Sequence, residues 1–314
     1  MPKIFLSTIR HKKWTVNTLR YLPCRVSSPG YATLSRRLSH SRRSLGKALA
    51  KNEFVLYYQP QVDINTGKMV SMEALIRWQH PQLGLVPPNQ FIPLAEESGL
   101  ICPIGEWVIR TACAQHQAWR ELGFPPIRIA VNLSARQFQQ PGLVKTIFDI
   151  LESTQIEPCY LEVEVTESIA MQDIDLTITV LQELRQMGIQ IAMDDFGTGY
   201  SSLNFIKHFP LHTVKIDQSF VRDLISDPSD AAIAKAVVAL GQGLNLKILA
   251  EGVETLEQLK FLQEIGCDAA QGYLFSKPLP AEALIPLFNS DSLLTQGLPH
   301  HLPDSGQYGT ERQT

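Results

Sequence analysis

The sequence predicts an α/β protein, namely a TIM-type (β/α)8 barrel variant, because eight strand-like apolar runs alternate with helix-like stretches over about 240 residues. The first two runs depart from this pattern. A turn of only a few residues joins them, and so short a connection cannot make a parallel crossover. These two strands are therefore expected to be antiparallel to each other. The alternation leaves a doubly wound open sheet as the alternative.

The expected strands are short apolar runs bounded by turn residues or polar stretches. They fall at residues 54–63, 69–78, 127–133, 160–165, 189–193, 213–216, 246–250 and 267–274. The first two are joined by Ile-Asn-Thr-Gly at 64–67, a hairpin turn signal. Six helical connections are expected between the later strands.

Two of these helices carry clear start and stop signals. Residues 174–188 place Ile and Leu at helical spacing and end in glycine, which commonly terminates a helix. Thr255 and Gln258 form a capping-box pattern before a second apolar stripe at 259–265, which Gly266 ends.

Charge is distributed very unevenly along the 314 residues. No Asp or Glu precedes Glu53, whereas twelve Lys and Arg lie in residues 1–52. The remainder holds 16 of the 28 basic side chains and all 31 acidic ones, a net charge of about −15. Because such a body repels polyanions, we expect no bulk nucleic-acid binding by it.

The two ends of the chain are expected to lie outside the folded domain. Residues 1–42 are basic, rich in serine and free of a sustained period, which suits a disordered linker, a misplaced start or an organelle transit peptide. Contact of this segment with an anionic membrane is a minor alternative. Residues 291–314 are also expected to be disordered, which leaves 43–290 as the domain.

Cysteine usage and hydropathy bear on location. The five cysteines are scattered, with no pair at metal-ligand spacing, as expected for free thiols in a reducing compartment. No apolar run is long enough for a membrane span. We therefore expect a cytoplasmic protein.

Polar side chains recur where the expected strands end. In a (β/α)8 barrel, catalytic groups lie at the carboxyl ends of the strands. The candidates at these ends are Glu73, Asn132, Glu164, Asp194, Asp195, Lys215, Glu251 and Gln271. Hard oxygen donors suit Mg²⁺ or Mn²⁺, and neither His nor Cys is among them to favour zinc. The adjacent carboxylates of Asp194 and Asp195 would repel each other, and a pair of cations that shares one of them would relieve this.

Some of these residues have plainer interpretations. Glu162 lies two residues before Glu164 and faces the same side of the strand, so either could be the inward ligand. Lys215 could be an ordinary ion-pair partner of Asp194 or Asp195. A single strand-end glutamate is usually a salt-bridge or capping residue, but polar groups at six consecutive strand ends favour a functional site.

Three motifs indicate a known protein family: EALIRW at 73–78, DDFGTGYSSL at 194–203 and EGVET at 251–255. With them the sequence closely resembles the EAL-domain cyclic di-GMP phosphodiesterases, from about residue 43 to residue 288. The resemblance implies a variant (β/α)8 barrel whose first strand is antiparallel. It also implies hydrolysis of cyclic di-GMP to linear pGpG with two Mg²⁺ or Mn²⁺ ions.

The resemblance also implies roles for individual residues. The first metal would be held by Glu73, Asn132, Glu164 and Asp194, and Asp194 would bridge to a second metal held by Asp195 and, partly through water, Glu251. The attacking water would be oriented or deprotonated by Lys215, with Gln271 close by. Because Lys215 could act as a base only if cations lowered its pKa, the orienting role is favoured.

Further implied roles concern the substrate and the loop after the fifth strand. Arg77 would contact a substrate phosphate, and Gln59 would lie in the substrate groove. Glu167 would support the loop 196–203, which would also form part of a homodimer interface. No position departs from the family pattern. The leading hypothesis is therefore an active phosphodiesterase, and the alternative is a non-catalytic cyclic di-GMP receptor that signals through a partner.

Overall fold

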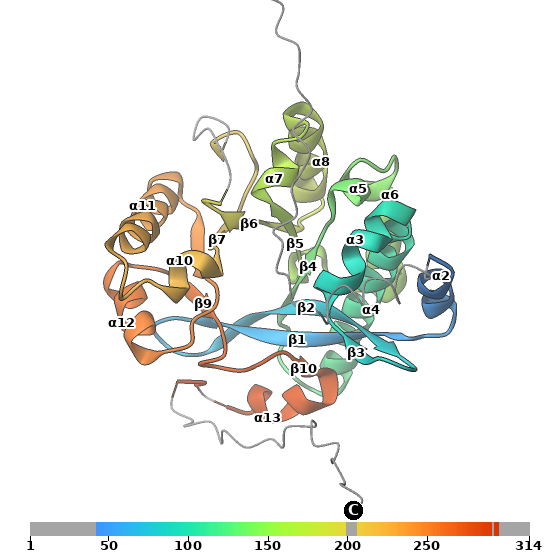
Figure 1. The fold of residues 1–314 in the computed structure, drawn as a ribbon, viewed down its shortest axis with the longest axis horizontal. Helices are drawn as coiled ribbons and strands as arrows, with labels where there is room; N and C mark the ends of the chain where they lie inside the picture. Colours follow the sequence, from blue (N-terminus) through green and yellow to red (C-terminus); the bar gives the residue numbers. More distant parts are fainter. Residues whose placement is uncertain (1–41, 199–205, 291, 295–314) are drawn as a thin grey trace, which may run out of the picture. The chain divides into compact units, whose positions relative to one another are not determined.

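A computed structural model describes residues 42–198, 206–290 and 292–294 of the chain (Figure 1). The predictions for residues 1–41, most of the loop 196–203 and most of the C-terminal tail lie outside these residues. At the start of the predicted tail, Leu293 is buried, and its backbone N–H donates to the carbonyl oxygen of Gly67 at 2.8 Å.

Eight strands close into a barrel, as predicted. The barrel strands are β1 Phe54–Asp63, β2 Met69–His80, β4 Arg128–Asn132, β5 Leu161–Thr166, β6 Gln190–Phe196, β7 Thr213–Ile216, β8 Lys247–Ala250 and β9 Ala269–Gln271. β1 is antiparallel to both of its neighbours, β2 and β9, whereas every other pairing around the barrel is parallel. The antiparallel first strand is thus confirmed, and the open sheet is wrong because β1 pairs with both β2 and β9 and closes the ring.

Two short strands extend the sheet and were not predicted. β3 (Gly84–Val86) pairs with the end of β2, and β10 (Leu279–Pro280) pairs with Tyr57 and Tyr58 of β1. Strands of two or three residues carry too little periodicity to be recognised in a sequence.

Helices lie outside the barrel strands (Figure 1). The α-helices are α2 Arg42–Ala50, α3 Pro88–Ser98, α4 Ile101–Glu121, α5 Ala135–Phe138, α6 Leu143–Thr154, α7 Glu167–Ala170, α8 Ile174–Gln186, α10 Gln218–Arg222, α11 Pro228–Leu244, α12 Leu256–Glu264 and α13 Ile285–Phe288. Short 3₁₀ turns cover Pro158–Tyr160 and Ala281–Leu284. Within the described residues, no helix is both long and apolar enough to cross a membrane.

The two helices with start and stop signals form where predicted. α8 ends just before Gly188, which has a φ of 93°. The Thr255 side chain accepts from the backbone N–H of Gln258, and the Gln258 side chain accepts from the backbone of Thr255, which completes the capping box of α12.

The last barrel strand is shorter than the predicted run 267–274. It stops at Gln271 because the next residue, Gly272, lies against the backbone of Val253; a Cβ there would come within 2.0 Å of the Val253 carbonyl oxygen. The backbone N–H of Val253 donates to the carbonyl oxygen of Gln271 at 3.0 Å. This contact ties the end of β9 to the loop that follows β8.

His116 on α4 is buried in the layer between helices and barrel. Its ring stacks on that of Tyr160 with centroids 5.1 Å apart, and neither ring nitrogen has a hydrogen-bond partner among the described residues. Burial, followed by the charge of Arg120, lowers the pKa of His116 to about 4. The folded protein therefore holds this imidazole neutral.

His116 should make the protein less stable in mild acid. Its pKa is lower in the folded than in the unfolded chain, so its contribution is fully present above pH 6.5 and is lost as the pH falls toward 4. We expect His116→Phe, which keeps the stacked ring, to reduce the loss of unfolding free energy between pH 7 and pH 5 by about 1–2 kcal/mol. Urea denaturation at both pH values measures this. Equal losses in the two proteins would contradict it.

Candidate active site

A buried ammonium group lies at the centre of the barrel mouth. Lys215 on β7 is 0% exposed. Its Nζ is 2.7 Å from Glu251 Oε1, 2.8 Å from Glu164 Oε2, 3.2 Å from Asp194 Oδ1 and 3.9 Å from Glu73 Oε2. Four carboxylates, from β2, β5, β6 and the residue that follows β8, thus converge on one positive charge. The ordinary ion-pair interpretation of Lys215 describes only one part of this arrangement.

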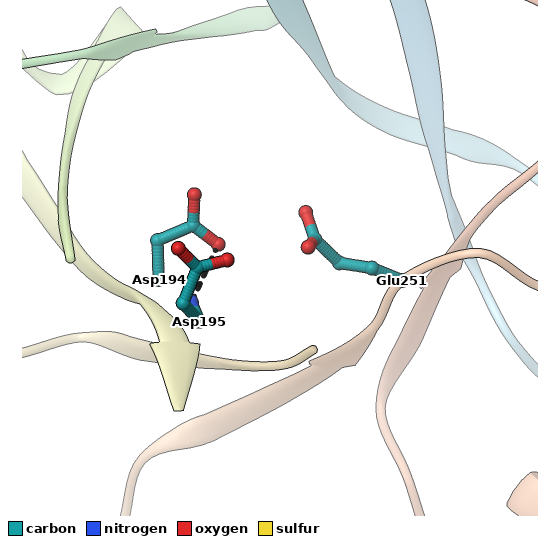
Figure 2. Close-up of side chains that lie close together, drawn as sticks. All are labelled: Asp194, Asp195 and Glu251. Atoms are coloured by element: carbon teal, nitrogen blue, oxygen red, sulfur yellow. Dashed lines mark hydrogen bonds between the residues drawn. The ribbon is translucent and has the colours of Figure 1, made fainter. Parts of the chain in front are cut away.

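The end of β6 bends so that both of its aspartates face the mouth. Successive side chains of a regular strand point to opposite faces. Here the pairing of β6 with β7 shifts register between Met193 and Phe196, and Asp195 takes a left-handed φ of 54°. Figure 2 shows Asp194 and Asp195 on one side and Glu251 facing them. Their ligand oxygens lie within 4.8 Å of one another, as oxygens sharing a cation would.

Two amide side chains hold Glu73. Asn132 Nδ2 donates to Glu73 Oε1 at 2.7 Å, and Gln271 Nε2 donates to Glu73 Oε2 at 2.7 Å. Because the Asn132 NH₂ group is used on Glu73, its carbonyl oxygen is the atom that this side chain can offer to a cation. Gln271 Nε2 also donates to Gln59 Oε1 at 3.0 Å.

The site is electrostatically unfavourable to its own carboxylates. Burial raises the pKa of Glu251 to about 8 and that of Glu164 well above its usual range, although Lys215 opposes both shifts. Burial lowers the pKa of Lys215, but Asp194 and the three glutamates outweigh it and hold the pKa well above its usual value. Lys215 is therefore charged.

Glu162 and Glu164 both face the barrel interior but at different depths. Glu162 is 3.4 Å from Arg128 Nη1 and lines a separate polar cavity of about 120 Å³ together with Lys247 and Thr213. Glu164 contacts Lys215 instead, and its Oε1 has no hydrogen-bond partner among the described residues. Of the two, Glu164 is the one in the carboxylate cluster.

Arg77 and Gln59 lie next to the cluster on β2 and β1. The Arg77 guanidinium is 5.8 Å from the centre of the Tyr57 ring, and its Nη1 donates to the carbonyl oxygen of Ile76 at 2.9 Å. Burial lowers the pKa of Arg77. Gln59 Nε2 donates to the carbonyl oxygen of Ser276 at 3.0 Å.

Glu167 opens α7 and reaches the loop after β6. Its Oε2 accepts from the backbone N–H of Gly197 at 3.0 Å. Gly197 has a φ of 95°, which favours glycine, and a Cβ there would lie 3.0 Å from the Phe220 ring. The remainder of this loop, from residue 199, lies outside the described residues.

Asp217 belongs to the site but is not among the residues that the sequence predicts for it. It caps α10, with its Oδ1 accepting from the backbone N–H of Ser219 at 3.0 Å. Burial, and then the charges of Asp194 and Asp217, raise the pKa of Asp195 to about 6. Its position directly after β7, two residues beyond Lys215, is the signal that could have found it, because the functional groups of such barrels lie at the carboxyl ends of the strands.

The cluster suits divalent cations. Its donors are carboxylate and amide oxygens, which are the ligands of Mg²⁺ and Mn²⁺, and the carboxylates outnumber the single ammonium group. Glu73, Glu164 and Asp194 are buried, Asp195 and Glu251 are half-buried, and Asn132 is exposed. The buried Glu164 Oε1, which lacks a hydrogen bond among the described residues, is a further oxygen that a cation would satisfy.

Replacing Lys215 should reveal what it costs to bury the surrounding carboxylates without a positive charge. We expect Lys215→Met to lower the unfolding free energy of metal-free protein by about 3–5 kcal/mol, because removing one partner leaves buried charges uncompensated. Mn²⁺ should restore part of the loss. Chemical denaturation in EDTA and in Mn²⁺ measures both effects.

The control is Lys145→Met, which breaks an exposed pair with Asp149. It should change stability by no more than about 0.5 kcal/mol under both conditions. An equally small effect of Lys215→Met in EDTA would contradict the prediction.

Sequence comparisons find a matching family model and similar curated proteins. The model of the EAL domain matches residues 42–278. The bifunctional diguanylate cyclase/cyclic di-GMP phosphodiesterase MucR of Pseudomonas aeruginosa is 51% identical over 77% of this chain and 35% of MucR. The cyclic di-GMP phosphodiesterase PdeR of Escherichia coli is 44% identical over 76% of this chain and 36% of PdeR. The chain thus spans about a third of the length of these curated relatives.

Solved structures agree with the sequence relatives. The MucR phosphodiesterase in complex with c-di-GMP superposes with a TM-score of 0.76 at 50% identity, over 79% of this chain and 100% of that one. The EAL enzyme Bd1971, in its cAMP- and cyclic-di-GMP-bound form, gives a TM-score of 0.74 at 32% identity, over 82% of this chain and 69% of Bd1971. The resemblance read from the three motifs is therefore confirmed: the chain belongs to the EAL-domain family.

Proposed function

We propose that this chain is a metal-dependent phosphodiesterase that hydrolyses cyclic di-GMP to linear pGpG. The observation that carries the proposal is the convergence of Glu73, Glu164, Asp194 and Glu251 on Lys215 at the barrel mouth. Similarity to relatives named for this activity, and to a structure that contains cyclic di-GMP, supports the choice of substrate.

The ligands divide into two sets that share one residue. Glu73, Asn132, Glu164 and Asp194 would hold one Mg²⁺ or Mn²⁺ ion. Asp194 would bridge to a second ion, held also by Asp195 and Glu251. Such a pair lowers the pKa of a bound water and offsets negative charge that develops on the phosphate. The bend at Asp195 supports this division, because it brings both aspartates to the same side.

Lys215 orients the attacking water rather than deprotonating it. Without cations, the surrounding carboxylates keep its pKa high. We expect it to stay charged, and so to donate hydrogen bonds, when the cations are bound. Gln271 donates to Glu73, one of the carboxylates around Lys215, and so holds it in place. In the reaction, the water oxygen bonds to one phosphorus, and the 3′ oxygen leaves with a proton. The ring opens, and a 5′ phosphate remains on the linear product.

Because the barrel mouth is acidic and the proposed substrate is an anion, binding requires positive charge at the mouth. Cations offset the repulsion between the carboxylates and the phosphodiesters, and the planar guanidinium of Arg77 would bind a phosphate at the rim. Gln59 would line the substrate groove next to Gln271. A homodimer that uses the loop after β6 remains part of this proposal; most of that loop lies outside the described residues.

The two aspartates should differ in their effect on metal binding. We expect the unaltered protein to bind two Mn²⁺ ions, Asp195→Ala to retain one site, and Asp194→Ala to lose both, because only Asp194 is shared. Both variants should lose hydrolysis by at least about 10²–10³-fold. Calorimetric Mn²⁺ titration and chromatographic detection of pGpG measure these outcomes. Identical metal stoichiometry in the two variants would overturn the bridging role.

Arg77 should act on substrate binding. Arg77→Ala should raise the KM for cyclic di-GMP by about 10–100-fold, the cost of losing charged hydrogen bonds, with a smaller change in kcat. The KM of Arg77→Lys should lie between those of the unaltered protein and Arg77→Ala, since lysine keeps the charge but not the planar fork. An unchanged KM would contradict this role.

Tight binding of cyclic di-GMP without turnover in either Mg²⁺ or Mn²⁺ would favour the receptor alternative over the enzyme.

A further inference from the structure

A row of buried amides runs from the barrel interior to the carboxylate cluster. Ser71 Oγ donates to Gln61 Oε1 at 2.5 Å, and Gln61 Nε2 donates to Gln271 Oε1 at 2.9 Å. Gln271 Nε2 then donates to Glu73 Oε2 at 2.7 Å. All four side chains are at most 6% exposed. We call these four residues the amide relay. Within it, Gln61 donates to Gln271 and, among the described residues, has no hydrogen bond to the carboxylate cluster itself.

The relay exists because β1 is antiparallel. Gln61 is paired with Ser71 on β2 and with Gln271 on β9. Side chains directly opposite each other on paired strands lie within reach. Since β1 runs against its neighbours, Gln59, which comes earlier in the chain, lies level with Glu73, and Gln61 lies one layer deeper. One strand thus supplies contacts at two depths.

The relay fixes the direction of each amide. A primary amide has a donor end and an acceptor end, so a partner at one end determines what the other end presents. The Glu73 carboxylate can only accept, so the Gln271 NH₂ faces it and the Gln271 oxygen is left to accept from the Gln61 NH₂. The Ser71 hydroxyl, which can donate or accept, donates to the Gln61 oxygen that remains. With the opposite rotation, Gln271 would present a carbonyl oxygen to the Glu73 carboxylate, which is repulsive.

Gln61 lies between the carboxylate cluster and a second polar space. Together with Ser71 it lines the polar cavity of about 120 Å³ that Glu162 also lines. Its hydrogen bonds to Ser71 and Gln271 hold its amide in place beside this cavity.

We infer that Gln61 is a positioning residue of the metal site: through Gln271 it keeps Glu73 oriented toward the first cation. The inference rests on the proposed function, since it concerns the ligand Glu73. Partners that hydrogen-bond a metal ligand typically change metal affinity by about 10–100-fold when removed. Gln61 acts one residue further away, so we expect the lower end of that range.

The test measures Mn²⁺ affinity by calorimetry, with no substrate present. Gln61→Met fills a similar volume without hydrogen bonds and should weaken Mn²⁺ binding about 10-fold. The KM for cyclic di-GMP should stay within about twofold, because Gln61 does not reach the groove. In a Gln271→Met background, Gln61→Met should have almost no further effect on Mn²⁺ binding, since the two residues act in series.

Gln263→Met is the matched control. Gln263 Nε2 donates to the carbonyl oxygen of Ile64 at 2.7 Å, just beyond the end of the strand that carries Gln61. It should lower the melting temperature in EDTA and leave Mn²⁺ affinity unchanged. If Gln61→Met fails to fold, Ser71→Ala replaces it, with a smaller loss of Mn²⁺ affinity, about threefold, because Gln61 then keeps its contact with Gln271 but loses its second hydrogen bond.

The outcomes separate the two proposals. Unaltered protein that binds no Mn²⁺ overturns both the metal-dependent function and the relay. Normal binding by the unaltered protein, together with either unchanged affinity in Gln61→Met or fully additive effects with Gln271→Met, overturns the relay alone.

Discussion

The structure of the barrel mouth depends on the compensation of buried negative charge. Lys215 supplies one positive charge to four carboxylates, and burial alone would favour protonation of two of them, Glu164 and Glu251. Such a cluster is a poor way to stabilise a fold, because buried ion pairs seldom repay their desolvation. Its arrangement makes sense as a site that cations complete, with Lys215 holding the carboxylates together before they bind.

The other features of the mouth serve this compensation. The parallel strands bring Glu164, Asp194, Lys215 and Glu251 to one end of the barrel, and the bend in β6 turns a second aspartate inward. The amides of Asn132 and Gln271 present hydrogen-bond donors to Glu73 rather than a further charge. Donors of this kind fix a carboxylate in place while leaving its charge available to a cation.

Local patterns in the sequence were sufficient to locate the eight barrel strands, the hairpin and the caps of two helices, since each depends on a few neighbouring residues. The different depths of Glu162 and Glu164 were not predictable, because both residues share one strand face. They are distinguished by their partners in the folded barrel, Arg128 for Glu162 and Lys215 for Glu164. The bend at Asp195 and the pairing of Gln61 with Gln271 depend on register between distant strands, which periodicity does not report. Asp217 was missed for a different reason: its spacing from Lys215 was visible, but a helix-capping role explains it equally well.

The contact of Gly272 with Val253 gives the mouth two mechanically different sides. On one side, Gln271 and the loop that follows Glu251 are joined backbone to backbone, through Val253 and Gly272. On the other side, Gly197, just after β6, is held by a carboxylate side chain, that of Glu167. A substitution of Glu167 would therefore remove the contact at β6, whereas the hydrogen bond between the Val253 and Gln271 backbones involves no side chain that a substitution could remove.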